Sequence, residues 1–193
     1  MSNMDVTITL QAARNYLLKG FSVIPILPRG KKPAIPWKEY QQRPPTEEEL
    51  VQWFGNGAKN NIGIVTGSVS GLAVVDLDSE QAFAFAKGKN LSHTPTVKTG
   101  RGHHVYCKSK EGVRNFQQRD DLPDIDLRAD GGYVVAPPSV HESGLVYGWV
   151  EGRGLGEIEM AELPSWVLAE KPGEKIAVGK LYQGVETGSR NTA

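Results

Sequence analysis

The stretch from Gly71 to Asp78 constrains the fold of this chain most, because an apolar run ends there in two carboxylates one residue apart. Side chains alternate faces along a strand, so Asp76 and Asp78 are expected on one face and Leu77 on the other. The Cα atoms of such a pair lie about 6–7 Å apart. Two carboxylates so placed can hold a pair of magnesium or manganese ions about 3.5–4 Å apart. The alternative is a structural role at a strand end, where aspartate caps backbone amides.

Composition narrows the class of protein. Lysine and arginine balance aspartate and glutamate at 22 each, so any contact with nucleic acid has to come from a local basic patch. With 193 residues, of which 39% are hydrophobic, the chain suits one globular domain or one domain with a tail.

No apolar stretch approaches the roughly 20 residues of a membrane span, and the start lacks the pattern of a secretory signal. The expected location is cytoplasmic. The single cysteine, Cys107, excludes an internal disulfide and is expected to be a buried thiol.

Hydrophobic periodicity predicts helices alternating with short strands. Helices are expected over residues 10–20, 46–55, 80–87 and 163–169, the second opening with a capping box. Strands are expected over residues 21–27, 61–66, 72–78, 94–97, 103–107, 124–130, 133–136 and 146–150. Pro25 indicates that the first strand lies at a sheet edge or ends near this proline. The short glycine-serine connection over residues 67–71 predicts antiparallel pairing of the strands on either side of it. The predicted fold class is therefore α+β.

The strand expected over residues 124–130 is a second source of carboxylates, because polar and apolar residues alternate along it without a break. Its polar face carries Asp124, Asp126, Arg128 and Asp130. A solvated strand face explains this pattern, but such a face is also what a third metal ligand requires. Alternation alone does not choose among the three aspartates.

Two other segments suit a phosphate ligand. Residues 98–102 join two predicted strands, and the two glycines there let the backbone approach a ligand while Lys98 and Arg101 supply positive charge. Residues 28–36 form a loop with three cations. These cations are Arg29, Lys31 and Lys32. For both segments the alternative is a turn whose cations face solvent.

The order of these features resembles the N-terminal bifunctional primase/polymerase (prim-pol) domain of the archaeo-eukaryotic primase superfamily. The matching segments are residues 20–25, Lys32-Pro33 with Trp37, 61–67, 74–78, Thr94-Pro95, 99–106, 125–128 and 131–139. The resemblance runs from the first helix to Ala169. It implies an archaeo-eukaryotic primase-like (RRM-like) catalytic core with mixed or antiparallel sheets and flanking helices.

Three motifs of that superfamily select site residues through the resemblance. The acidic pair falls on Asp76 and Asp78, the motif of a small residue, any residue and histidine falls on Gly102-His103-His104, and the acidic residue after an apolar one falls on Asp126. The implied metal ligands are Asp76, Asp78 and Asp126, which would bind two Mg²⁺ or Mn²⁺ ions. Together with His104, which would reach a nucleotide phosphate, they are the implied catalytic residues.

Further nucleotide contacts are expected beside His104. They are Arg101, Lys98, Arg128, Ser139 and His141. Each has a structural alternative, such as an ion pair for Arg128, a turn for Ser139 and solvent exposure for His141. Tyr133 is expected in the core rather than as a base-stacking surface. His103 is expected to face away from His104 and to pack or lie at the surface.

The resemblance implies a template-directed nucleotidyltransferase, a DNA primase/DNA polymerase that synthesises or extends primers on single-stranded DNA. Its substrates would be NTP or dNTP, and its setting plasmid, phage or mobile-element replication. Residues 1–170 are the expected catalytic domain, and residues 171–193 a linker and the start of a following helical domain. A C-terminal helical or helicase region is therefore an expected partner, and a membrane is not.

Two other functions stay open from the residues. One is a metal-dependent nuclease or phosphodiesterase, because paired carboxylates serve hydrolysis equally well. The other is a non-catalytic nucleotide- or DNA-binding module of a replication initiator, in which the acidic residues are structural.

Overall fold

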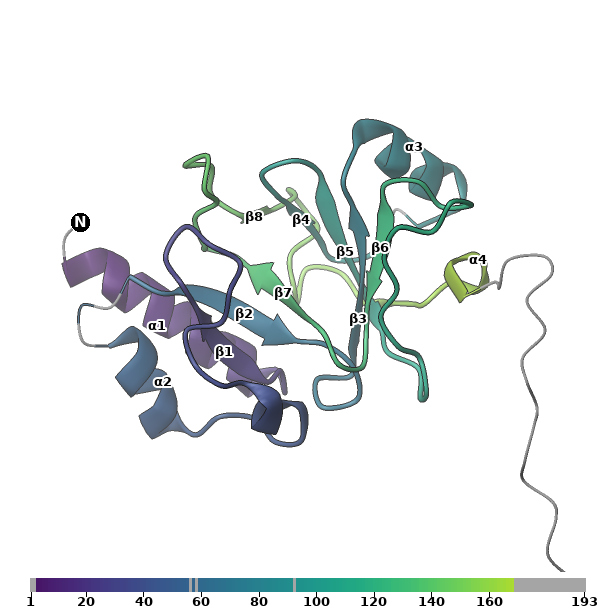
Figure 1. The fold of residues 1–193 in the computed structure, drawn as a ribbon. Coiled ribbons are helices and arrows are strands. Elements are labelled where there is room, and N and C mark those ends of the chain that lie inside the picture. The colour runs from purple at the N-terminus through teal and green to yellow at the C-terminus, as the bar shows by residue number, and fades with distance from the viewer. Residues whose placement is uncertain (1–2, 56, 58, 92, 169–193) are drawn as a thin grey trace, which may run out of the picture.

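Two β-sheets organise the computed structural model, which describes residues 3–55, 57, 59–91 and 93–168 (Figure 1). The smaller sheet has the strand order β1-β2-β7, and the larger has the order β6-β3-β5-β4-β8, with β9 paired to β5. All pairings are antiparallel except β5 with β9. The fold is therefore α+β with mainly antiparallel sheets, as predicted. The tail expected over residues 171–193 lies outside the described residues.

The smaller sheet consists of β1 (Val23–Ile26), β2 (Asn61–Val65) and β7 (Tyr133–Ala136). Helices α1 (Asn3–Leu18) and α2 (Glu47–Phe54) lie beside it (Figure 1). Their buried side chains share one apolar core with β1, β2 and β7. The position of β1 at the sheet edge confirms the prediction from its proline, which has no N–H for a ladder.

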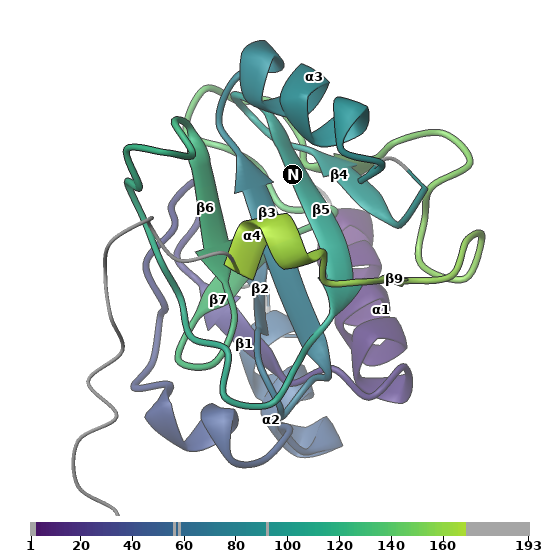
Figure 2. The same cartoon turned by 90° about the vertical axis from the view of Figure 1, so that its right-hand side faces the viewer.

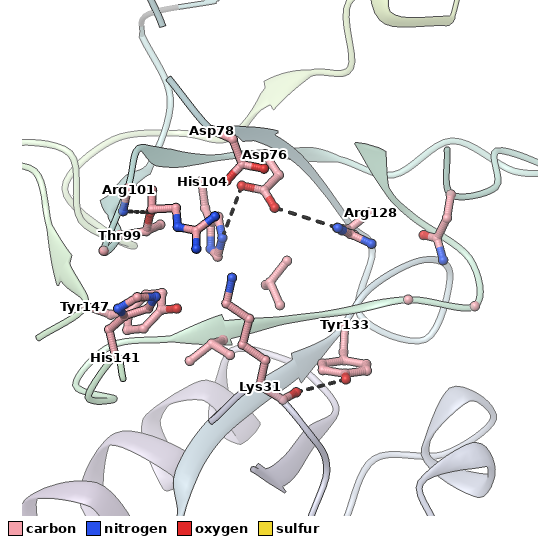
Figure 3. Close-up of a pocket in the computed structure, with 16 residues that line it drawn as sticks. Lys31, Asp76, Asp78, Thr99, Arg101, His104, Arg128, Tyr133, His141 and Tyr147 are labelled. Carbon is pink, nitrogen blue, oxygen red and sulfur yellow. Dashed lines mark hydrogen bonds and ion pairs between the residues drawn. The ribbon is translucent and has the colours of Figure 1, made fainter. Parts of the chain in front are cut away.

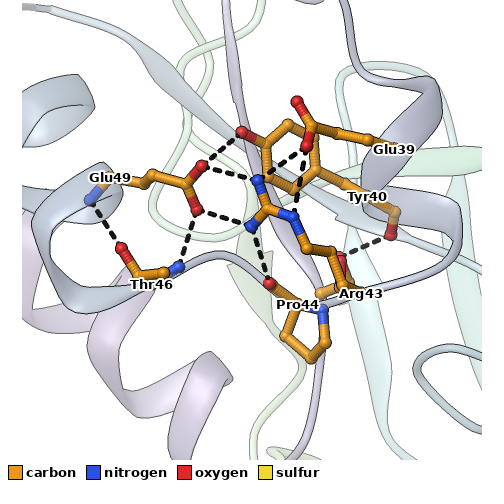
Figure 4. Close-up of polar contacts among 7 residues, drawn as sticks. Glu39, Tyr40, Arg43, Pro44, Thr46 and Glu49 are labelled. Carbon is orange, nitrogen blue, oxygen red and sulfur yellow. Dashed lines mark hydrogen bonds and ion pairs between the residues drawn. The ribbon is translucent and has the colours of Figure 1, made fainter.

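Helix α2 begins with the predicted capping box. The Thr46 hydroxyl accepts the Glu49 N–H, and the Glu49 carboxylate accepts the Thr46 N–H at 2.7 Å. The same carboxylate accepts two hydrogen bonds from Arg43 and one from Tyr40, all at 2.8 Å (Figure 4). This network joins α2 to the short 3₁₀ helix η1 (Lys38–Gln41).

The larger sheet separates two apolar layers. It consists of β3 (Leu72–Leu77), β4 (Thr96–Lys98), β5 (His103–Lys108), β6 (Ile125–Arg128), β8 (Gly148–Trp149) and β9 (Ala161–Glu162). Helices α3 (Glu80–Gly88) and α4 (Ser165–Leu168) lie on the face turned away from the smaller sheet (Figure 2). Ala73, Val75 and Leu77 face these helices, and Cys107 is a buried free thiol in the same layer, as predicted.

Strand β3 presents its other face to the smaller sheet. Leu72 and Val74 belong to the apolar core shared with β1, β2 and β7. The next residue of that face is Asp76, because side chains on alternate positions share a face. The strand therefore carries its first carboxylate toward the space between the two sheets.

The predicted pairing of β2 with β3 is wrong. A single bridge joins Gly67 to Leu72, after which β3 enters the larger sheet between β5 and β6. β2 instead lies between β1 and β7. Both edges of each strand are occupied by partners distant in the sequence, and this tertiary pairing outweighs the short connection between them.

Two other strand predictions need correction. The regular strand around residues 124–130 is confined to Ile125–Arg128, because Asp124 has a φ of +58° and Asp130 leaves the ladder. The strand expected over residues 146–150 is only Gly148–Trp149, and the later strand β9 was not predicted. In the described part of the chain, none of the helices has the length and apolarity needed to span a membrane.

Candidate active site

Three carboxylates converge where β3 and β6 lie side by side. Asp76 is the direct cross-strand partner of Asp126 on β6 and of His104 on β5. Asp78 follows the end of β3, where its N–H donates to the Asp124 carbonyl at 2.9 Å. One carboxylate oxygen from each of Asp76, Asp78 and Asp126 lies within 4.8 Å of the others. These residues form the acidic cluster.

The structure brings Asp126, and neither of its two alternatives, to the acidic cluster. Asp130 is held elsewhere, because its carboxylate accepts the Ser68 N–H at 2.7 Å. Asp124 lies outside β6 with a positive φ. The alternation that placed all three aspartates on one face holds only within the four residues of β6.

The donor set of the acidic cluster fits a hard divalent cation. Burial raises the pKa of Asp78, and the negative charges of Asp76 and Asp126 raise it further. Arg128 lies 3.0 Å from Asp126 and 3.9 Å from Asp76, measured between guanidinium nitrogen and carboxylate oxygen. Among the described residues, no hydrogen bond or ion pair engages the Asp78 carboxylate. Asp126 accepts the Gln118 N–H at 3.0 Å in addition to its contact with Arg128. Three crowded carboxylates supply the hard oxygen ligands that Mg²⁺ or Mn²⁺ prefers.

The adjacent histidines point to opposite faces of the larger sheet. His104 is buried, and its Nε2 lies 3.5 Å from Asp76 Oδ1. Its Nδ1 has no hydrogen-bond partner among the described residues. Burial lowers the pKa of His104, which Asp76 opposes only in part, so the ring is neutral at neutral pH. His103 stacks on Phe83 of α3 with ring centroids 4.0 Å apart, in agreement with its predicted packing role.

The hairpin between β4 and β5 carries the predicted glycine-arginine turn. The Thr99 hydroxyl accepts the N–H groups of Arg101 at 3.3 Å and Gly102 at 3.0 Å. A Cβ on Gly102 would collide with the Leu77 carbonyl, and one on Gly100 would lie 2.5 Å from the His141 ring. Glycine at these two positions therefore lets the hairpin pack against the end of β3, beside the acidic cluster.

These groups open onto one cleft between the sheets, with a volume of about 240 Å³ (Figure 3). It is lined by Lys31, Asp76, Asp78, Thr99, Gly100, Arg101, His104, Asn115, Arg128, Gly131, Gly132, Tyr133, Val134, Val135, His141 and Tyr147. The negative charges in the cleft wall are those of Asp76 and Asp78. The positive charges are those of Arg101 in the β4–β5 hairpin, Arg128 on β6 and Lys31 in the loop after β1.

The Prim-Pol family model, described as bifunctional DNA primase/polymerase, N-terminal, matches residues 13–166. The chain belongs to this family. The matched range includes both sheets and all residues that line the cleft. No curated protein matches the chain. Membership gives this Prim-Pol domain a primase/polymerase-type activity, and its acidic cluster is able to bind metal.

Two predicted nucleotide contacts lie away from the cleft of the Prim-Pol domain. Lys98 pairs with His103, so its side chain is on the sheet face that bears α3 rather than on the face of the acidic cluster. Ser139 is buried, and its hydroxyl accepts the Ile62 N–H at 2.8 Å and contacts the Ile62 carbonyl at 3.3 Å. Its role is to join the chain after β7 to β2. Neither Lys98 nor Ser139 lines the cleft, and as nucleotide contacts both stay untested predictions.

The other predicted contacts of the Prim-Pol domain line the cleft. Arg101, Arg128 and His141 join His104 there. His141 is buried rather than exposed, and its Nδ1 accepts the Ser143 N–H at 3.2 Å. Arg128 forms an ion pair with Asp126, which was its structural alternative, and also reaches the cleft.

Sequence reasoning missed several groups of the site. Tyr147 is buried between His104 and His141, with ring centroids 6.0 and 6.1 Å away. Burial raises its pKa to about 12, so its phenol stays protonated. Tyr133 packs against the apolar core, as predicted, but it is only half-buried and also lines the cleft, which the sequence did not indicate. Lys31 was one of three equivalent cations in its loop, and only the fold distinguishes it.

Proposed function

We propose that this Prim-Pol domain is a template-directed nucleotidyltransferase, a DNA primase/DNA polymerase that synthesises or extends primers on single-stranded DNA from NTP or dNTP. The observation that carries the proposal is the acidic cluster, in which Asp76, Asp78 and Asp126 offer oxygens within 4.8 Å of one another. Asp76 and Asp78 lie in the wall of the cleft, which Lys31, Arg101 and Arg128 also line. This arrangement supports a two-metal-ion reaction on a phosphate ester.

The proposed metal ligands are the three aspartates, with two Mg²⁺ or Mn²⁺ ions as cofactors. Bound ions would supply charge that lowers the pKa of the primer 3′-hydroxyl and stabilises the departing pyrophosphate. Asp76 has a fixed backbone position in the proposed site, because it lies in β3 and is paired with β5 on one side and with β6 on the other. Asp78 has a carboxylate that no described hydrogen bond competes for, so it can turn toward the cleft.

The proposed phosphate contacts are His104, Arg101 and Arg128. His104 is fixed by burial beside Asp76, and a neutral imidazole donates one N–H to a phosphate oxygen without repelling metal ions. Arg101 and Arg128 flank the acidic cluster from the hairpin and from β6. Preorganised donors of this kind stabilise charge that develops during transfer. His141 and Tyr147 are proposed to contact the nucleotide at the wall beyond His104.

The biological setting we propose is replication of a plasmid, phage or mobile element. Residues 1–170 would act as the catalytic domain, and a C-terminal helical or helicase region as its partner in the full-length protein. Because the chain has no net charge, we expect the domain to bind template DNA through a local basic surface rather than through nonspecific electrostatic attraction.

The test is primer extension and dinucleotide synthesis on single-stranded DNA with Mg²⁺ or Mn²⁺. We expect the wild-type chain to form products and the double variant Asp76→Ala/Asp78→Ala to form none. Asp124→Asn is the matched control, because it changes a nearby aspartate outside the acidic cluster. Equal activity in the wild type and the double variant would exclude the metal assignment. Loss of labelled DNA with manganese and without nucleotides would favour a nuclease instead.

A further inference from the structure

The loop that follows β1 brings one cation across the cleft to the acidic cluster. Lys31 belongs to the part of the fold built around the smaller sheet, yet it lines the same cleft as Asp76, Asp78 and His104 on the larger sheet. Figure 3 shows its side chain extending from the opposite wall toward His104 and the aspartates. The other two cations of the loop, Arg29 and Lys32, do not line the cleft.

The backbone on both sides of Lys31 is fixed by hydrogen bonds. The Leu27 N–H donates to the Lys32 carbonyl at 2.8 Å, and the Ala34 N–H donates to the Pro25 carbonyl at 2.8 Å. A bridge also pairs Ile26 with Pro33. The loop is therefore a closed turn on the edge strand β1, and not a freely moving connection.

Tyr133 fixes the cation-bearing residue itself. Its hydroxyl donates to the Lys31 carbonyl at 2.9 Å, and its ring packs edge-on against Trp37 with centroids 4.9 Å apart. Tyr133 begins β7, which pairs with β2 in the smaller sheet. The position of Lys31 is thus set by the sheet that faces the acidic cluster.

The ammonium group of Lys31 has no ion pair with a carboxylate in the described part of the chain. An unpaired cation opposite a cluster that suits metal ions is placed for a polyanion held between them.

We propose that Lys31 binds the phosphate chain of the nucleotide substrate from the wall opposite the acidic cluster, with Tyr133 as the residue that positions it. This inference rests on the proposed function and adds a substrate contact from the smaller sheet. Arg101 and Arg128 approach the phosphates from the larger sheet, so Lys31 completes the positive surround on the remaining side. A compact ammonium on a flexible stem suits a phosphate chain whose oxygens shift between substrate and product.

The test measures binding of ATP, dATP and inorganic triphosphate by calorimetry in the presence of Mg²⁺, separately from catalysis. In Lys31→Met we expect the Kd of all three to rise about tenfold or more, the change expected from losing one charged hydrogen bond. Lys31→Arg should retain most of the affinity. Lys32→Met is the matched control, because it removes the neighbouring cation that lies outside the cleft. Thermal melts verify that each variant is folded.

Tyr133→Phe tests the positioning role in primer extension. We expect a higher KM for nucleotide with kcat nearly unchanged, because loss of the hydrogen bond loosens the loop without removing a reacting group. An unchanged KM for nucleotide, whether or not kcat falls, would overturn the positioning role of Tyr133.

Three results would overturn the assignment of Lys31. They are an unchanged Kd in Lys31→Met, an equal loss in Lys32→Met, and a loss in Lys31→Met confined to single-stranded DNA, which would make the lysine a DNA contact. In each case a wild-type chain that binds ATP or dATP leaves the proposed function intact. A wild-type chain that binds no nucleoside triphosphate with Mg²⁺ would contradict the proposed function itself, and the inference with it.

Discussion

Asp76 and Asp126 face each other directly across the β3–β6 ladder, at positions where like charges destabilise a sheet. Arg128 lies beside both and offsets part of the repulsion, but Asp78 adds a third negative charge within the same cluster. A fold selected for stability alone would place an opposite charge or an apolar pair there. The arrangement is explained if the repulsion is relieved by bound cations.

Replacing Asp78 with asparagine is therefore predicted to stabilise the metal-free protein. Partial desolvation in the cleft and the charges of Asp76 and Asp126 disfavour the ionised Asp78 carboxylate in the fold. We expect the melting temperature in EDTA at neutral pH to rise by only about 1–2 °C, because the Asp78 side chain is still exposed and solvent screens its charge. With saturating Mn²⁺ the order should reverse, since ion binding to the wild type stabilises the folded state by linkage. Differential scanning fluorimetry checks both arms, and a wild-type melt that ignores Mn²⁺ would count against the site.

We predict that His104 contributes to catalysis, whereas the neighbouring His103 contributes to the stability of the fold. His104→Ala should lower kcat about 10²–10³-fold, as expected for loss of one preorganised donor to developing charge. His103→Ala should lower the free energy of unfolding by about 1 kcal/mol through loss of its stacking on Phe83, with kcat nearly kept. Primer extension and urea denaturation on the two variants give the comparison. The reverse pattern would show that the sheet faces are assigned wrongly.

Gly102→Ala is predicted to damage both the fold and the activity. The added Cβ would meet the Leu77 carbonyl, so the hairpin and the end of β3 would have to move apart. We expect a loss of about 1–3 kcal/mol in the free energy of unfolding, typical of an overpacked site, and little primer extension because Asp78 follows Leu77. Gly144→Ala gives the contrast, since its Cβ would meet nothing within 4 Å and only its positive φ would be strained. Normal activity in Gly102→Ala would contradict the close packing of hairpin and strand.

Glu49 is predicted to contribute a pH-dependent stability unrelated to the cleft. Hydrogen bonds from Arg43, the main cause, lower its pKa to about 2 (Figure 4). The contribution of the Glu49 charge is complete above about pH 4.5 and is lost as the pH falls toward 2, because the folded state then has to take up a proton. Glu49→Gln keeps the capping box but should cost about 1 kcal/mol at pH 7. Urea denaturation at several pH values should show that difference shrinking below pH 4, with nucleotide binding at pH 7 unchanged. A difference that is constant with pH would contradict the charge argument.

Local patterns in the sequence predicted the elements and much of the acidic cluster. Period-two alternation placed Asp76 on the face opposite Leu77, and the capping box marked the start of α2, because both depend on residues close together in the chain. The resemblance to prim-pol domains added Asp126 and His104, which the structure brings beside Asp76. Alternation had left Asp124 and Asp130 open. The positive φ of Asp124 and the hydrogen bond from the Ser68 N–H to Asp130 keep these two aspartates out of the acidic cluster.

What the sequence did not predict depends on pairing between distant segments. The short connection before Leu72 favoured a hairpin, but competition from β1, β5, β6 and β7 for strand edges decided otherwise. Lys98 was predicted as a phosphate contact because it lies beside the glycine turn, but its register with His103 places it on the other face of the sheet. Lys31 was indistinguishable from Lys32 until the two sheets were placed against each other.

The metal assignment is tested most directly by a crystal structure with Mn²⁺ and a non-hydrolysable nucleoside triphosphate, using the anomalous signal of manganese. We expect two manganese peaks among the carboxylates of Asp76, Asp78 and Asp126, at oxygen distances of about 2.0–2.2 Å, with a phosphate oxygen within hydrogen-bond reach of His104. Manganese absent from these carboxylates, or a nucleotide bound away from the cleft, would contradict this expectation.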